Sequence, residues 1–145
     1  MAITQALANS FKKQLIDGDH SFASGSDVYK IALYSSSATL NSATTSYTTG
    51  NEVGDSGQYS AGGGKLTGNN TSIASGVAIV DFADRSFTGV TLTARGALIY
   101  NTSATVANAA VAALDFGADK TATSGTFTIQ FPAFTTAAAI LRISG

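Results

Sequence analysis

Hydrophobic positions near the start of the chain recur with the period of an amphipathic helix. Leu7, Phe11 and Leu15 stand four residues apart, so their side chains share one helical face. Thr4 is a residue type that favours the N-cap position. The pattern therefore predicts a helix over residues 4–16, and no other segment shows the same period as clearly.

After the helix the hydrophobic period changes to two, which is typical of strands with one buried face. In the clearest example Phe127, Ile129 and Phe131 alternate with polar residues until Pro132, which cannot donate to a strand ladder. A bulge is expected at Arg95–Gly96, between two parts of one long strand. The predicted strands cover residues 27–34, 46–49, 58–61, 71–82 with a bend or bulge at Gly76, 86–94 continued by 96–100, 109–116 ending at Gly117, 126–131 and 138–143.

These elements predict an all-β fold, an antiparallel β-sandwich of about eight strands, jelly-roll-like, with one N-terminal α-helix. The 145 residues are interpreted as a single domain, with the helix in residues 1–18 and the sandwich in residues 27–145. Residues 35–70 are rich in Ser, Thr and Gly. Because this region also contains Tyr47 and Tyr59 as hydrophobic anchors, we expect it to be ordered and to carry only short strands.

Composition excludes several classes of protein. Only 12% of the residues are charged, and the net charge is −1. Nucleic-acid binding without sequence preference needs a basic surface, so no nucleic-acid partner is expected. The chain has no Cys, which excludes disulfides, zinc fingers and thiol nucleophiles. No membrane span and no secretory signal are expected either.

The acidic residues offer two candidates for chemistry. Asp17, Asp19 and His20 follow the predicted helix and could bind a cation, but we favour a polar turn because the EF-hand spacing is incomplete. Asp81 and Asp84 could act as a catalytic carboxylate pair. Such a pair at a strand end is more often a turn, in which an Asp side chain bonds backbone N–H groups.

Other motifs fail on spacing or context. Residues 115–117 spell the Asp-Phe-Gly triplet of protein kinases, yet the other kinase motifs are missing. Residues 62–65 resemble a phosphate-binding loop only in part, and we interpret them as a glycine turn. A serine hydrolase would have to use His20 as its base, without a nucleophile elbow. No catalytic residue, metal site or cofactor is predicted.

Several segments together resemble a family of small structural proteins of tailed bacteriophages. The resemblance follows the same order along nearly the whole chain. It is carried by residues 1–7 (MAITQAL), 10–12 (SFK), 29–34 (YKIALY), 47–53 (YTTGNEV), 81–84 (DFAD), 93–101 (TARGALIYN), 113–117 (ALDFG), 119–120 (DK), 127–132 (FTIQFP) and 139–143 (AILRI).

The resemblance implies a virion structural protein, most like the capsid decoration (cement) proteins, which bind the outer surface of an assembled head. The implied partners are the major capsid protein and further copies of this chain, as a dimer or trimer. The candidate interface residues are Leu7, Phe11, Leu15, Tyr47 and Tyr59. A component of the tail or a fibre that binds the host surface is the alternative, and a small hydrolase that uses Asp81 and Asp84 ranks last.

Overall fold

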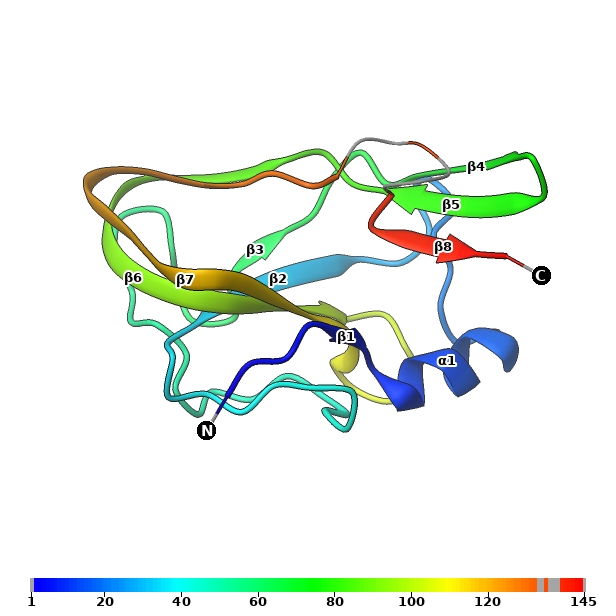
Figure 1. The fold of residues 1–145 in the computed structure, drawn as a ribbon, viewed down its shortest axis with the longest axis horizontal. Coiled ribbons are helices and arrows are strands. Elements are labelled where there is room, and N and C mark those ends of the chain that lie inside the picture. The colour runs from blue at the N-terminus through cyan, green and yellow to red at the C-terminus, as the bar shows by residue number, and fades with distance from the viewer. Residues whose placement is uncertain (1, 133–134, 136–138, 145) are drawn as a thin grey trace.

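The computed structural model describes residues 2–132, 135 and 139–144, and it consists of two antiparallel sheets and one short helix (Figure 1). The five-stranded sheet has the order β1-β7-β6-β2-β3, and the three-stranded sheet has the order β4-β5-β8. This confirms the prediction of an all-β, sandwich-like fold with one N-terminal helix. The elements are β1 (Ala6–Leu7), α1 (Asn9–Ile16), β2 (Tyr29–Tyr34), β3 (Gly64–Lys65), β4 (Asn70–Ala74), β5 (Val77–Asp81), β6 (Arg85–Asn101), β7 (Ala109–Ile129) and β8 (Leu141–Ile143).

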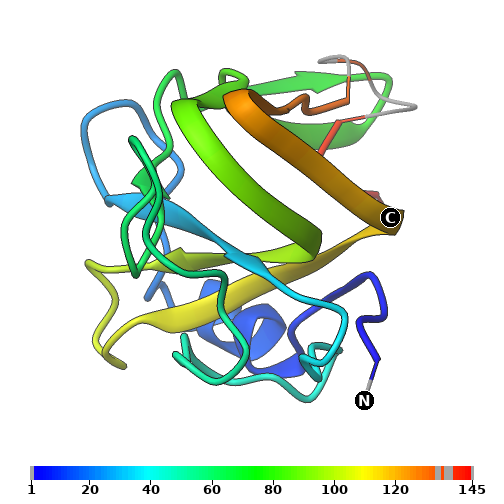
Figure 2. The same ribbon diagram turned by 90° about the vertical axis from the view of Figure 1, so that its left-hand side faces the viewer.

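One long hairpin, β6 with β7, links the two layers. Its strands run together through one layer and curve over into the other (Figures 1 and 2). The register shifts between Ala94 and Gly96, which confirms the predicted bulge. Arg95 at this bulge donates from Nε to Asp115 Oδ1 at 3.0 Å. The expected strand end at Gly117 is wrong, because β7 continues through this bend to Ile129.

The helix begins later than the sequence pattern predicts. Residues 6 and 7 form β1, which pairs with β7 through Ala6↔Ala113 and Leu7↔Ala112. Thr4 does not cap the helix, because its backbone N–H donates to the carbonyl of Leu40 at 2.8 Å. In the first turn of a helix without a cap, the backbone N–H groups have no partner within the helix. Pairing with the sheet and with Leu40 gives backbone N–H and C=O groups of residues 4–7 hydrogen-bond partners instead.

The predicted strand over residues 71–82 is two strands. β4 and β5 form a hairpin whose turn contains Ser75 and Gly76, with φ of 49° and 75°. Two consecutive positive φ angles characterise the tight turns that fit the twist of a hairpin. Gly76 therefore reverses the chain rather than bending one strand. The last strand is also shorter than expected: β8 begins at Leu141, and residue 138 lies outside the described residues.

Residues 35–68 are held by side chains more than by strands. The strands expected near residues 46–49 and 58–61 are single bridges, Ser46↔Ala109 and Ser56↔Tyr59, while β3 takes up part of the expected glycine turn. The carboxylate of Glu52 fixes this region. It accepts the hydroxyls of Tyr47 (2.6 Å) and Tyr59 (2.7 Å) and the backbone N–H of Gly62 (2.7 Å).

A single cluster of buried residues fills the space between the layers and includes the inward positions predicted from alternation. Val90, Leu92, Phe127 and Ile129 are buried, as expected, while Phe131 packs against the cluster from a half-buried position. On the outer side of the hairpin the exposed hydroxyls bond across the strands, at 2.9 Å for Ser86 with Thr128 and 2.8 Å for Thr93 with Thr121.

The approach of the 35–68 region to β2 supplies a test of this packing. A methyl group at Gly63 would lie 1.7 Å from the carbonyl oxygen of Ile31. Gly63→Ala is expected to lower the free energy of unfolding by about 3 kcal/mol or more, because the backbone of β2 must move. Gly25 has nearly the same φ, +79° against +78°, with nothing within 4 Å. Gly25→Ala should cost only about 1 kcal/mol, for the backbone conformation alone. Urea unfolding of both variants measures the difference, and equal losses would contradict the predicted clash.

Candidate interaction groove

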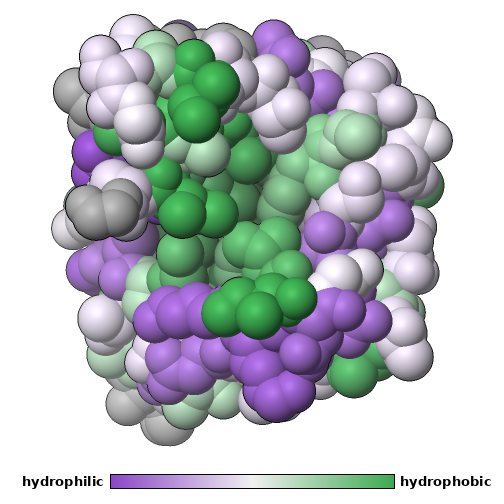
Figure 3. Space-filling view, turned by 90° about the vertical axis from the view of Figure 1, so that its right-hand side faces the viewer, coloured by the Kyte–Doolittle hydropathy of each residue, from purple (hydrophilic) through white to green (hydrophobic). Residues whose placement is uncertain are grey.

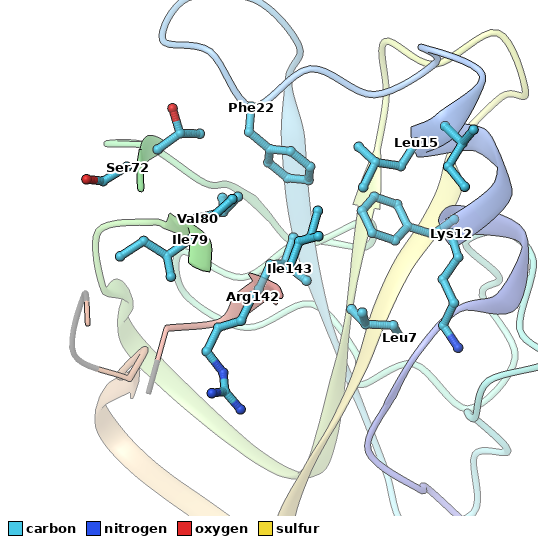
Figure 4. A pocket seen from close by; sticks show the side chains of 14 residues that line it. Leu7, Lys12, Leu15, Phe22, Ser72, Ile79, Val80, Arg142 and Ile143 are labelled. Carbon is cyan, nitrogen blue, oxygen red and sulfur yellow. The ribbon is translucent and has the colours of Figure 1, made fainter. Parts of the chain in front are cut away.

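An apolar groove lies between α1 and the three-stranded sheet (Figure 4). Its cavity volume is about 320 Å³. One wall comes from the N-terminal part of the chain and the other from β4, β5 and β8. The lining residues are Leu7, Phe11, Lys12, Leu15, Ile16, Phe22, Thr71, Ser72, Ala78, Ile79, Val80, Leu141, Arg142 and Ile143.

Large exposed aliphatic side chains surround this groove. Ile16 is 88% exposed and Ile143 is 57% exposed, and both line it. Ile73, which is 72% exposed, lies on the neighbouring strand β4. Figure 3 shows the result as a hollow of hydrophobic surface above a hydrophilic band. Contiguous apolar surface of this kind marks sites of interaction with other molecules.

Aromatic contacts hold the helix side of the groove. Phe11 meets the ring of His20 edge-on at 4.8 Å and that of Phe22 at 6.0 Å. Phe22 in turn stacks on Tyr29 of β2 at 4.6 Å. Pairs of this geometry add stabilisation beyond the area that they bury. The wall made by α1 is therefore anchored to the five-stranded sheet rather than to the opposite wall.

A buried hydrogen-bond network behind Phe11 fixes the end of the helix. Asn101 Nδ2 lies 2.9 Å from His20 Nδ1 and donates to Asp27 Oδ2 at 2.7 Å. His20 Nε2 lies 2.9 Å from Gln14 Oε1 on α1. Since Asn101 donates through this amide nitrogen, Nδ1 accepts and Nε2 carries the proton. Burial lowers the pKa of His20, and the nearby carboxylates of Asp27 and Asp19 oppose this shift more weakly.

The charges at the groove are of one sign. Lys12 and Arg142 are the charged residues among those that line it. Figure 4 draws their cationic groups on opposite walls of the groove, with Leu7 between them. Lys12 donates to the neutral Oδ1 of Asn9 at 3.3 Å, whereas the neighbouring Lys13 pairs with Asp17. The lining of the groove is thus apolar apart from these two cations and the hydroxyls of Thr71 and Ser72.

The structure places the five candidate interface residues in two groups. Leu7 and Leu15 are half-buried in the groove walls, and Phe11, only 2% exposed, lies at the base of the helix side. Tyr47 is half-buried and Tyr59 is fully buried, and both bond to Glu52 away from the groove. Tyr59 therefore offers no surface to a partner in this conformation.

The sequence pattern did not identify the opposite wall. Leu141 and Ile143 lie on a strand of three residues, which is too short to show a clear period. Ile16 belongs to the apolar stripe of the helix, but its exposure depends on where the sheets leave the helix uncovered. Nothing in the local pattern separates an exposed isoleucine from a core one.

The other candidates for chemistry have structural partners. Asp84 accepts the backbone N–H of Phe131 at 2.9 Å, and Thr105 donates to Asp19 at 3.1 Å. Asp115 accepts from the N–H of Gly117 and from Arg95, and these bonds lower its pKa. In the described part of the chain no three histidine or acidic side chains converge as a metal site would require.

Comparison with protein-family models, with curated proteins and with solved structures finds no match. Within the residues that the structure describes, no helix has the length and apolar character needed to cross a membrane. The functional interpretation therefore rests on the residues and on the geometry of the groove.

The role of Tyr59 as a structural anchor can be tested with a matched pair of variants. Its hydroxyl accepts the buried N–H of Leu33 at 2.8 Å and donates to Glu52. Tyr59→Phe should lower the free energy of unfolding by about 1–3 kcal/mol, because a buried donor loses its acceptor. Tyr47→Phe removes a half-buried hydroxyl and leaves the buried N–H of Leu33 paired with Tyr59, so its effect should be smaller. Chemical denaturation measures both, and an equal or larger loss for Tyr47→Phe would refute this assignment.

The His20 network predicts a pH dependence of stability. Because the pKa of His20 is lower in the folded than in the unfolded chain, the unfolded chain binds more protons below its pKa of about 6.5. The stability of the wild type should therefore fall as the pH is lowered from about 7.5 to about 5.5, and this contribution should be absent from His20→Gln. Thermal unfolding across this range tests the prediction, and identical slopes for the two proteins would contradict it.

Proposed function

We propose that this chain is a virion structural protein of a tailed bacteriophage, a capsid decoration protein that binds the outside of the assembled head. It acts by binding rather than by catalysis. Its partners are the major capsid protein and further copies of itself, as a dimer or trimer. The observation that carries the proposal is the exposed apolar groove between α1 and the three-stranded sheet, taken together with the resemblance along the chain.

The groove supports a role in binding a macromolecule. Desolvation of exposed isoleucines gains free energy only when another surface covers them. Ile16, Ile73 and Ile143 lie on three different elements, so a partner that covers them also ties α1 to the hairpin β4–β5 and to β8. Such a contact stabilises this protein and its partner together.

The low content of charge fits the same role. Cores of protein interfaces are depleted in charged residues, since each charge buried without a partner costs free energy. The outer side of β6 and β7 is exposed and carries hydroxyls that already bond to each other, such as Thr93 with Thr121. The hydroxyl-bearing part of this side is our candidate surface for contacts between copies.

The tail or fibre alternative has less support. It is motivated by the Tyr, Ser, Gly and Asn residues of the stretch 46–70, because such residues make adaptable contact surfaces. Both tyrosine hydroxyls of this stretch serve the chain's own fold, because those of Tyr47 and Tyr59 bond to Glu52. They are not available as free contact groups.

The proposal predicts that binding to heads depends on the groove. Ile143→Asp should weaken binding of the purified protein to assembled heads by about tenfold or more, because a charge replaces an apolar contact at the centre of an interface. Val106→Asp is the matched control, since Val106 is 47% exposed and lies outside the groove lining. Co-sedimentation with heads that lack this protein measures both.

The wild-type protein should also raise the temperature at which those heads break down. If it neither binds heads nor changes their heat resistance, the proposal is wrong. If electron microscopy locates the chain on the tail, the alternative replaces it.

A further inference from the structure

We propose that the free edge of β4 pairs antiparallel with the same strand of a second copy, so that two molecules join their three-stranded sheets about a twofold axis at Ser72. The inference deepens the proposed function, which expects contacts between copies, and rests on it only for the role of this contact on a head. Three observations support it: the exposure of β4, the direction of its unpaired backbone groups and its lack of charge.

β4 (Asn70–Ala74) is an open edge of its sheet. It is the outermost strand in the order β4-β5-β8, and among the described residues it pairs with β5 alone (Figure 1). All five of its residues are exposed, and Ile73 is 72% exposed. An accessible strand edge with free backbone N–H and C=O groups is a template for pairing with another strand.

The turn of the β4–β5 hairpin determines which backbone groups are free. Ala74 and Val77 flank the two turn residues, so they form a hydrogen-bonded pair. Bonded and non-bonded pairs alternate along an antiparallel ladder, so the backbone groups of Thr71 and Ile73 point away from β5. In the part of the chain that the structure describes, these two N–H and two C=O groups have no hydrogen-bond partner. They are available to a further strand.

The free groups of β4 are self-complementary. In an antiparallel pair centred on Ser72, Thr71 lies opposite Ile73 of the second copy, and Ile73 lies opposite Thr71 of that copy. Each of these two pairs exchanges two backbone hydrogen bonds, so every free group finds a partner. A centre at Thr71 or at Ile73 would instead pair one of them with residue 69 or with turn residue 75, outside the strand. Ser72 is therefore the expected centre.

The lack of charge distinguishes β4 from the other sheet edges and suits pairing with its own copy. Its residues Asn, Thr, Ser, Ile and Ala oppose no like charges when two copies meet. The other described edges are shorter or charged, and charge on an edge discourages pairing. β1 has only two residues, β3 contains Lys65, β8 contains Arg142, and the parts of β6 and β7 beyond their neighbours carry Arg85, Asp119 and Lys120.

Pairing through β4 also covers its exposed isoleucine. Ile73 lies beside Ala78 of β5, which lies beside Ile143 of β8, so the three form one apolar row across the sheet. Thr71 of the second copy extends this row, and contacts between β-branched side chains on adjacent strands stabilise a sheet. Two three-stranded sheets become one of six strands. Ile143 lies two strands away from the joint, so the groove stays open to the capsid protein.

A single cysteine tests both the contact and its register, because the chain contains none. Residues opposite each other in a non-hydrogen-bonded pair have Cα atoms about 4.5 Å apart, a distance that a disulfide spans. Under mild oxidation with diamide, we expect Ser72→Cys to form a disulfide-linked dimer at least about tenfold faster than Thr93→Cys. Thr93 is the matched control, because it is an exposed hydroxyl residue on the outer side of β6.

Proline at position 73 tests the backbone bonds. Ile73→Pro removes an N–H that β5 does not use, so the variant should fold but dimerise at least about tenfold more weakly. Ile73→Thr keeps the N–H and the β-branch, so it should dimerise. Sedimentation measures the dissociation constants, and urea unfolding checks that both variants fold. If the proline variant does not fold, wild-type amide exchange decides: the N–H groups of Thr71 and Ile73, but not that of Ser72, should exchange more slowly at high protein concentration.

The outcomes separate this inference from the proposed function. A chain that stays monomeric at millimolar concentration, with equal cross-linking at positions 72 and 93, overturns the pairing, while the decoration role stands if that monomer binds heads. A dimer that Ile73→Pro leaves intact also overturns it and places the contact on another surface. Loss of head binding by Ile73→Pro from a monomeric chain would assign β4 to a strand of the capsid protein instead. A dimer through β4 that binds no heads overturns the proposed function alone.

Discussion

The β6–β7 hairpin is the constraint on which the rest of the fold depends. It supplies two strands to the five-stranded sheet and curves over beside the three-stranded sheet, so it links the two layers. The bend needs the backbones to approach closely: a methyl group at Gly96 would lie 2.4 Å from the carbonyl oxygen of Leu114. Opposite this point β7 gains extra residues, and the bond of Arg95 to Asp115 closes the resulting bulge. Bulges of this kind let a paired strand turn a corner without losing its ladder.

The hydrogen bonds of the Glu52 carboxylate order residues 35–68, which lie outside the hairpin. Residues 35–68 form almost no sheet, yet Glu52 gathers Tyr47, Tyr59 and the backbone of Gly62 around one carboxylate. Tyr100 of β6 stacks on Tyr47 at 4.8 Å and donates to the carbonyl of Gly62 at 2.6 Å, so the cluster is attached to the hairpin itself. One acidic group with several donors thus replaces the strands that alternation would have predicted. It also shows how a chain with few charges can order a long polar region.

The sequence pattern predicts those parts of the fold in which local periodicity and tertiary structure agree. Alternation at Phe127 and Ile129 placed both inside, because one face of a sheet is buried along its whole length. The sequence pattern fails where contacts with distant segments decide which secondary structure a residue adopts. Whether Leu7 belongs to a helix or to β1 depends on the strand of Ala112, far along the chain. Of the groove, the helix stripe indicated one wall, whereas Ile143 could be placed only once the sheets were known.

The same hairpin explains where the groove lies. Its bend closes the sandwich at one end, and at the other end β8 and β1 are edges of different sheets (Figure 1). The short helix α1 covers part of this open end, held by Phe11 and by the bond between Gln14 and His20. Eight residues of helix cannot span both layers, since they extend only about 12 Å. The apolar surface left between α1 and β8 is therefore a consequence of the topology, and its free energy is lowered only when something covers it. Edge strands and apolar surface at one end are what a sandwich needs in order to be completed by another chain.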